Sequence, residues 1–466
     1  MSGAELPLWT AEQRESFFVA IARHRRAAWQ VSAVAAVCIA ILAFVVATLT
    51  APLFYALMGL LLDGINLFVP MPDLLGVMLD TLGEVSDHME TLPASRWLYL
   101  AFVAAVPGLI AVLIVLLALR RIVREAEESS VQELALRAPN QSVLAEQRFA
   151  NVVTEMAIAA NIKMPKLAII DMPAVNAAVY GPDDATVTVL VSTGLLERLN
   201  RAQMQAVAGH LIGLIANGDV VQGMRVAQTL SLFGFVARLS DGIVDPPGWS
   251  RLWQTLREAL KRGASRADSR LILELINPFG QTRGRPSSTS NKLTWREWIR
   301  MPLYGPIVIS GFFGGMVSNF FLEPLLALIW RRRKYLADAI AVQLTRDPQA
   351  LSDALGELGN GSGFPAWCSH MLVAGGADGG GLLSGSSLPM YPAHDKRLKA
   401  LARMGATVTL SPPPPMAFWL QIFIAVAGLF VVALMTLATY LLVMISIALS
   451  GLFTLFPAVI LHALLR

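Results

Sequence analysis

The stretch with the most chemical information is residues 206–219, which read AVAGHLIGLIANGD. A helix that binds a catalytic zinc ion carries H-E-x-x-H, because histidines four positions apart share one helical face and the glutamate serves as general base. His210 stands at the first histidine of such a pattern, whereas Leu211 stands at the glutamate and Leu214 at the second histidine. One imidazole does not hold zinc, and a leucine neither accepts a proton nor polarises water. The segment therefore matches a zinc-binding helix at its first histidine but lacks the general base and the second metal ligand.

The elements that must position this helix have clear local signals. Asn200, followed three residues later by Gln203, forms a capping box and predicts the start of the helix, and Asn217 with Gly218 predicts its end. Two β-branched runs, residues 166–171 and 186–192, flank the turn residues 181–184 and predict a hairpin.

Five segments in a fixed order resemble the HtpX-like membrane metallopeptidases, relatives of the prenyl-protein proteases, over roughly residues 150–404 and two preceding spans. The segments are MPKLAIIDMPAVNAAVYG from Met164, VSTGLLERLNRAQMQAVAGH ending at His210, IANGD ending at Asp219, YLADAIAVQLTRDP ending at Pro348, and YPAHDKRLKAL from Tyr391. The resemblance implies an α+β fold, in which a zincin-like metallopeptidase domain of helices with a small β-sheet is embedded in a polytopic α-helical membrane protein.

The resemblance also implies a third zinc ligand, a glutamate three residues before an Ala-Asp pair. The residue at that position is Lys334, ahead of Ala337 and Asp338. A protonated lysine has no lone pair for a metal and reverses the charge of the ligand it replaces. No metal ligand set and no cofactor are therefore expected. We hypothesise that a buried Lys334 ammonium takes the place of zinc, paired with Asp338 near His210.

Two further sets of residues are candidates for binding. Residues Asn176, Ala177, Ala178 and Val179 resemble the edge strand with which active family members pair an extended substrate, so they predict a peptide-binding surface. Asn319 and Glu323 are polar residues within the apolar run 303–330, and intramembrane polar groups are functional candidates.

Composition predicts a polytopic membrane protein. Of the 466 residues, 55% are hydrophobic and 15% charged, and the mean hydropathy is +0.57. Residues 29–49 and 98–119 are long enough to span a bilayer.

Arginines precede the first span and follow the second, while the loop between them is acidic. This asymmetry predicts that the loop faces outward and that the peptidase-like domain is cytoplasmic at a bacterial-type inner membrane. The net charge of +4 is too small to favour nucleic acid.

The middle and the end of the chain predict further spans. Either residues 220–236 and 303–330 both cross the membrane, or the second run is a re-entrant hairpin. Residues 418–465 carry no charge and predict two spans joined by a tight turn. The expected domain organisation is a cytoplasmic N-terminus (1–28), two spans with an acidic loop (29–119), the first part of the peptidase-like domain (120–219), a membrane-associated insert with one or two spans (220–330), the second part of the domain (331–410), and a Pro-rich spacer with a C-terminal transmembrane hairpin (411–466).

These features predict an integral-membrane pseudopeptidase that contacts membrane lipids and organises other membrane proteins. One alternative is an active metal-dependent endopeptidase that binds zinc through unorthodox ligands. The other is a channel or lipid-handling component, in which transport of ions or lipids would depend on Asn319 or Glu323.

Overall fold

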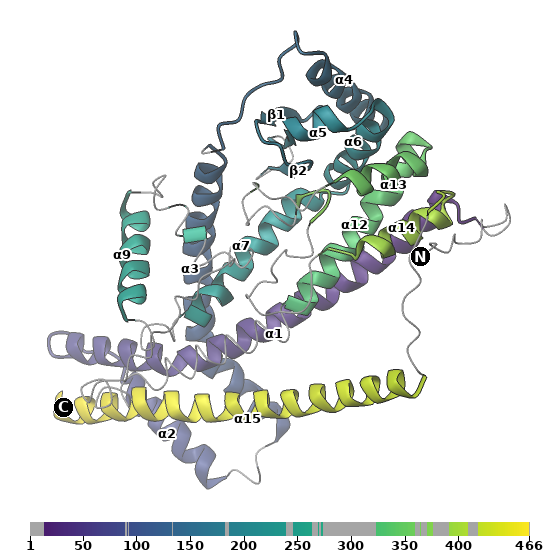
Figure 1. The fold of residues 1–466 in the computed structure, drawn as a ribbon. Helices are drawn as coiled ribbons and strands as arrows, with labels where there is room; N and C mark the ends of the chain where they lie inside the picture. The colour runs from purple at the N-terminus through teal and green to yellow at the C-terminus, as the bar shows by residue number, and fades with distance from the viewer. Residues whose placement is uncertain are drawn as a thin grey trace.

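The computed structural model describes residues 14–88, 91, 93–132, 134–181, 186–238, 246–262, 269, 272–273, 323–358, 364, 371–375, 391–408 and 418–465. This part of the chain is mostly helical with one small sheet (Figure 1). The helices before the sheet are α1 (Phe17–Asn66), α2 (Leu74–Asp87), α3 (Ala94–Gln132) and α4 (Leu144–Ala159). After the sheet follow α5 (Thr193–Arg198), α6 (Arg201–Ala216), α7 (Asp219–Arg238), α9 (Pro246–Arg262), α12 (Glu323–Thr345), α13 (Pro348–Glu357), α14 (His394–Arg403) and α15 (Phe418–Leu465).

The sheet has three strands, β1 (Lys166–Ile170), β2 (Ala177–Tyr180) and β3 (Thr188–Ser192), in the order β1-β3-β2. β3 runs parallel to β1 and antiparallel to β2. The hairpin predicted between residues 166–171 and 186–192 is therefore wrong. The short strand β2 lies between these two runs in sequence, so the chain reverses direction twice between them. β3 therefore pairs antiparallel with β2 and parallel with β1.

The helix that carries His210 begins and ends where its sequence predicts. The Asn200 side chain accepts a hydrogen bond from the Gln203 backbone N–H at 3.0 Å, and the Gln203 side chain accepts one from the Asn200 N–H at 3.0 Å. At the other end Gly218 has φ +67°, a conformation that favours glycine.

α6 and α12 pack closely because α6 has glycines on the shared face. A Cβ added at Gly209 would lie 3.3 Å from the Ala341 Cα, and one at Gly213 would lie 3.1 Å from Ile340 Cγ2. Both distances are tighter than ordinary contact, so larger residues would push the helices apart. This close approach sets His210 of α6 against Asp338 of α12.

Among the described residues, three helices are long and apolar enough to cross a membrane, judged by length and composition: Phe17–Leu49, Ala94–Gln132 and Thr436–Leu465. A fourth candidate is the bent pair Arg201–Ala216 and Asp219–Leu230, whose axes differ by 64°. The spans predicted at residues 29–49 and 98–119 fall within the first two helices. The sheet, α4 and α6 gather at one end of the molecule, away from α15 (Figure 1).

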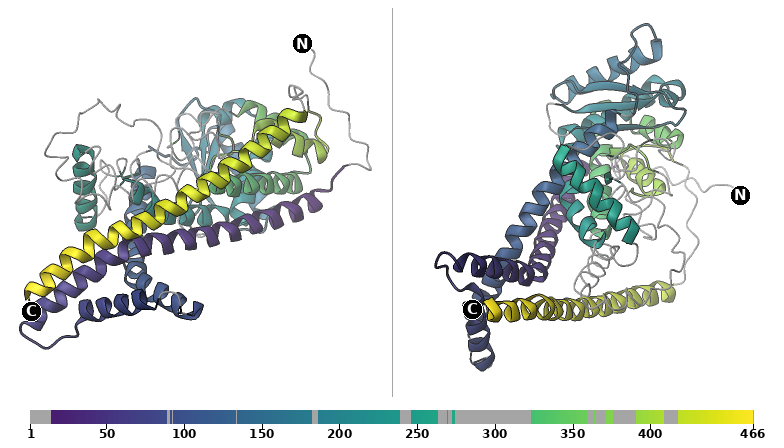
Figure 2. Two further views of the ribbon diagram at one scale, coloured as in Figure 1. Left: turned by 90° about the horizontal axis from the view of Figure 1, so that it is seen from below. Right: turned by 90° about the vertical axis from the view of Figure 1, so that its left-hand side faces the viewer.

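α15 is one continuous helix of 48 residues, where the sequence predicts two spans joined by a turn. The structure thus corrects the predicted hairpin: residues 429–450 contain no glycine or proline, so nothing interrupts the helical hydrogen bonds. Its C-terminal part lies along α1 (Figure 2). There the Ser450 hydroxyl donates to the Leu49 carbonyl at 2.8 Å, and His462 Nδ1 lies 2.7 Å from Asp63 Oδ2.

The two membrane spans predicted in the middle of the chain, residues 220–236 and 303–330, are only partly described. Residues 220–236 lie within α7. Residues 303–322, with Asn319, lie outside the described part of the chain, and Glu323 is described only as the first residue of α12.

Candidate functional site

His210 lies fully buried in α6, with an exposed fraction of 0%. Its Nδ1 lies 2.8 Å from Asp338 Oδ1 but at an angle outside hydrogen-bond geometry, and its Nε2 has no hydrogen-bond partner in the described part of the chain. Burial lowers the pKa of His210 to about 4, although the Asp338 carboxylate opposes this shift. The imidazole is therefore neutral near pH 7. With its proton on Nδ1, facing the carboxylate, it leaves a lone pair on Nε2.

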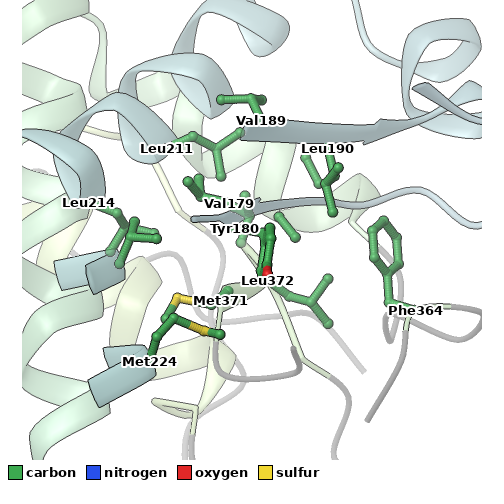
Figure 3. Packing of buried hydrophobic residues seen from close by; sticks show 14 of the residues in the cluster. Val179, Tyr180, Val189, Leu190, Leu211, Leu214, Met224, Phe364, Met371 and Leu372 are labelled. Carbon is green, nitrogen blue, oxygen red and sulfur yellow. The ribbon is translucent and has the colours of Figure 1, made fainter. Parts of the chain in front are cut away.

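Leu211 and Leu214 are core residues. Both belong to the main hydrophobic cluster of the molecule, and Figure 3 shows Leu211 beside the strands β2 and β3. Labelled members of the same cluster are Val179, Tyr180, Val189, Leu190, Met224, Phe364, Met371 and Leu372. The positions of the general base and of the second histidine thus contribute packing where a peptidase would place polar groups.

Lys334 lies on α12 with an exposed fraction of 1%. Its Nζ donates a hydrogen bond to the Leu372 carbonyl and lies 5.6 Å from the centre of the Tyr391 ring. Burial, together with the Arg397 charge, lowers the pKa of Lys334 to about 7. The structure therefore places Lys334 in the interior near His210, but its hydrogen-bond partner is a backbone carbonyl and not the Asp338 carboxylate.

Asp338 instead binds Arg397 through both of its oxygens. Arg397 Nε donates to Oδ2 at 2.9 Å, and Nη2 donates to Oδ1 at 2.6 Å. Burial raises the pKa of Asp338, but the charge and hydrogen bonds of Arg397, together with the nearby His210 imidazole, outweigh burial, and the pKa lies well below its ordinary value. Sequence reasoning missed this role of Arg397. The available signal was its place in the segment YPAHDKRLKAL, which resembles a family motif.

The predicted peptide-binding residues lie at the edge of the sheet. β2, with Ala177, Ala178 and Val179, pairs with β3 on one side only. On its other side Ala178 forms an antiparallel bridge with Leu372, and the Val373 N–H donates to the Ala177 carbonyl at 2.9 Å. The structure thus brings the edge strand together with a segment of the same chain that the sequence did not single out.

The residues at this site do not fit a zinc ion. Zinc needs lone pairs from nitrogen, sulfur or carboxylate oxygen. In the described part of the chain, His210 Nε2 is available, but the Asp338 oxygens are engaged by Arg397. The remaining positions are Leu211, Leu214 and Lys334, whose amine donates to the Leu372 carbonyl. The described group that could hold a metal ion is elsewhere, at the C-terminal end of α15, and consists of Asp63, Asp73 and His462.

The comparisons with known proteins agree on the class of this domain. Residues 144–245, which run from α4 through the sheet and α6 into α7, match the model of peptidase family M48. Residues 144–245 are therefore similar to a peptidase M48 domain, in a chain whose described part also holds helices long and apolar enough to cross a membrane. Its curated relatives narrow the resemblance: the proteins it is similar to are named Protease HtpX homolog, which supports an HtpX-like member of this metallopeptidase family.

The relatives are similar over less than half of this chain. A Protease HtpX homolog from Ligilactobacillus salivarius is 28% identical over 205 residues, covering 44% of this chain and 55% of the relative. Homologs from Streptococcus equi subsp. equi and Thermoanaerobacter pseudethanolicus are 28% and 26% identical, covering 46% and 45% of this chain and 57% and 56% of the relatives. The chain thus spans about half the length of the curated relatives it matches. No solved structure matches it.

Proposed function

We propose that this protein is a membrane-embedded pseudopeptidase, an HtpX-like chain that no longer hydrolyses peptide bonds. The observation that carries the proposal is the buried amine of Lys334, which lies where the family resemblance implies a zinc ligand and donates to a backbone carbonyl. Where a zinc site would lie, Arg397 pairs with Asp338 beside a neutral His210, and the Lys334 amine lies close by on the Leu372 carbonyl.

Electrostatics supports this proposal. Burial is the main cause that lowers the pKa of His210, and the charges of Lys334 and Arg397 act in the same direction, whereas the Asp338 carboxylate opposes them. A metal ion here would have to lose its water beside the positive charge of Arg397. At the effective dielectric of a protein site, two like unit charges 4 Å apart repel by about 4 kcal/mol, and a divalent cation doubles this. Leu211 belongs to the hydrophobic core and stands at the position of the general base, where its side chain cannot take a proton from water.

The proposed role is to bind and organise other membrane proteins and lipids. α15 supports it, because large apolar side chains such as Trp419, Phe423 and Phe430 are more than two-thirds exposed along it. The arginine asymmetry of the first two spans favours a cytoplasmic domain at a bacterial-type inner membrane. The role predicts that the protein purifies with other membrane proteins in mild detergent; a chain that always emerges alone contradicts it.

Metal analysis of the detergent-purified protein tests the loss of the zinc site. We expect the wild-type chain to lack stoichiometric zinc. The variant Leu211→Glu/Leu214→His/Lys334→Glu restores the missing groups beside His210, and we expect it to bind about one zinc ion per chain. Leu211→Glu/Leu214→His is the matched control, because it keeps the ammonium and is expected to bind no zinc. Stoichiometric zinc in the wild type, with proteolysis lost on chelation, would overturn the proposal.

A further inference from the structure

A five-residue segment, residues 371–375, lies along the outer edge of β2, the edge that does not pair with β3. The bridge between Ala178 and Leu372 is antiparallel, and the Val373 N–H donates to the Ala177 carbonyl at 2.9 Å. A strand edge carries unpaired N–H and C=O groups that accept another extended chain. Here the chain itself supplies that partner.

Three successive carbonyls of this segment are held by buried side chains from three different places in the fold. Lys334 Nζ on α12 donates to the carbonyl of residue 372, and Arg397 Nη1 on α14 donates to the carbonyl of residue 373 at 2.8 Å. Asn176, at the start of β2, donates from Nδ2 to the carbonyl of residue 374 at 2.6 Å. Hydrogen bonds from charged donors are stronger than neutral ones, so the backbone of this segment is fixed by specific contacts.

Side-chain packing seats the same segment. Leu372 lies in the hydrophobic cluster close to Tyr180, and Met371 lies near Met224 (Figure 3). Gly375 follows at a point where no larger residue fits, because a Cβ there would come within 1.9 Å of the Tyr391 ring. Tyr391 is also the ring over which Lys334 lies.

We propose that residues 371–375 are an internal strand that occupies the extended-peptide site of this domain, and that Lys334 holds this strand by its carbonyl. An extended segment of another protein then reaches β2 only by displacing residues 371–375. The inference rests on the proposed function in one respect: the lysine that holds the strand stands at the position of the lost zinc ligand.

Disulfide trapping in membranes tests the placement of the strand. Ala178 and Leu372 form a non-hydrogen-bonded antiparallel pair, whose Cα separation suits a disulfide. In a chain with Cys38→Ala and Cys368→Ala, we expect Ala178→Cys/Leu372→Cys to cross-link under mild oxidation. Tyr180→Cys/Leu372→Cys is the matched control, because such diagonal neighbours lie about 7–8 Å apart and do not bridge. Absence of the first cross-link, or equal yields from both pairs, overturns the internal strand.

Hydrogen exchange of the full-length protein in detergent tests how the strand is held. Lys334→Met removes a charged donor, so we expect the amide of residue 373 to exchange about tenfold faster or more. Gly375→Val keeps Lys334 but collides with Tyr391, and we expect faster exchange there as well. Unchanged protection of β3 in each variant shows that the domain remains folded. Unchanged exchange at residues 371–375 in Lys334→Met overturns the holding role.

The two proposals fail separately. Stoichiometric zinc in the wild-type chain would remove the pseudopeptidase proposal without affecting the cross-link between positions 178 and 372. A zinc-free protein that forms no cross-link would remove the internal strand and leave the loss of the catalytic site standing.

Discussion

Lys334 places a cationic side chain in the protein interior, where burial lowers its pKa to about 7. The charged groups whose fields act on it come from three helices, Arg397 on α14, Asp338 on α12 and Asp219 on α7. In the unfolded chain the same lysine has a pKa of about 10.4. Between these two values the unfolded state binds more protons than the folded state. The buried charge therefore destabilises the fold fully below pH 7, and this cost disappears as the pH rises towards 10.5.

Replacing Lys334 by methionine should remove this pH dependence. We expect the Tm of Lys334→Met minus that of the wild type to be greatest at and below pH 7 and to fall as the pH rises to 10. Thermal unfolding in detergent at pH 6, 8 and 9.5 measures the difference. Lys396→Met, which changes an exposed lysine of α14, is the control and should show no such trend. A difference that stays constant with pH contradicts the burial of a titrating amine.

At the scale of residues, the sequence predicted where the site lies but not which residues contact one another there. The spacing around His210 and the charge of Lys334 were sufficient to identify which residues stand at the expected zinc-ligand positions, and the loss of metal binding stays a prediction. The partner of Asp338 was not predictable, because Arg397 is 59 positions away and reaches the carboxylate only when α14 packs near α12. The Lys334 hydrogen bond to the carbonyl of residue 372 likewise depends on a segment with no strand signal of its own.

At the scale of elements, α1 and α15 are joined by a buried polar pair, Asp63 and His462. Asp63 and His462 are 5% and 9% exposed, and the facing oxygen and nitrogen lie 2.7 Å apart. Asp73, which caps α2, lies 3.7 Å from the other ring nitrogen of the same histidine. Removing one member of a buried pair leaves the other without its partner, which costs several kcal/mol. The pair therefore fixes where α15 docks along α1.

A double-mutant cycle measures this contact. We expect His462→Ala and Asp63→Ala each to lower the free energy of unfolding by about 2 kcal/mol or more, and the double variant to cost less than their sum. The coupling energy should fall in the range of roughly 0.5–3 kcal/mol. His88→Ala, at an exposed histidine, is the control and should change stability by less than about 0.5 kcal/mol. Additive effects of His462→Ala and Asp63→Ala would show that the helices dock without the pair.

The elements were predictable where their signals are local. The capping residues Asn200 and Gln203 correctly predicted the start of α6. The strand order was not predictable, because β2 is four residues long, begins with two alanines and pairs on one edge with residues almost 200 positions away. The continuity of α15 was misjudged from length alone: 48 apolar residues suffice for two spans, but the run has no breaker at its centre.

For the whole molecule, the contact between α1 and α15 determines on which side of the membrane residue 465 lies. The acidic segment between the first two spans, which begins with Asp63 near the end of α1, is expected outside. Because His462 contacts Asp63, the end of α15 must lie on the same side as that loop. A two-span C-terminal hairpin would instead return the chain to the cytoplasm. One span within Thr436–Leu465 therefore predicts an outward-facing end.

Cysteine accessibility in intact cells distinguishes the two topologies, in a chain with Cys38→Ala and Cys368→Ala. We expect Leu465→Cys to react with a membrane-impermeant maleimide as readily as Gly83→Cys, a position in the acidic loop with open space around it. Arg198→Cys, at an exposed position after the sheet, is the cytoplasmic control and should react only after the membrane is permeabilised. Labelling of Leu465→Cys only after permeabilisation would mean that residues 418–465 cross the membrane twice, and that the contact between His462 and Asp63 does not form in the bilayer.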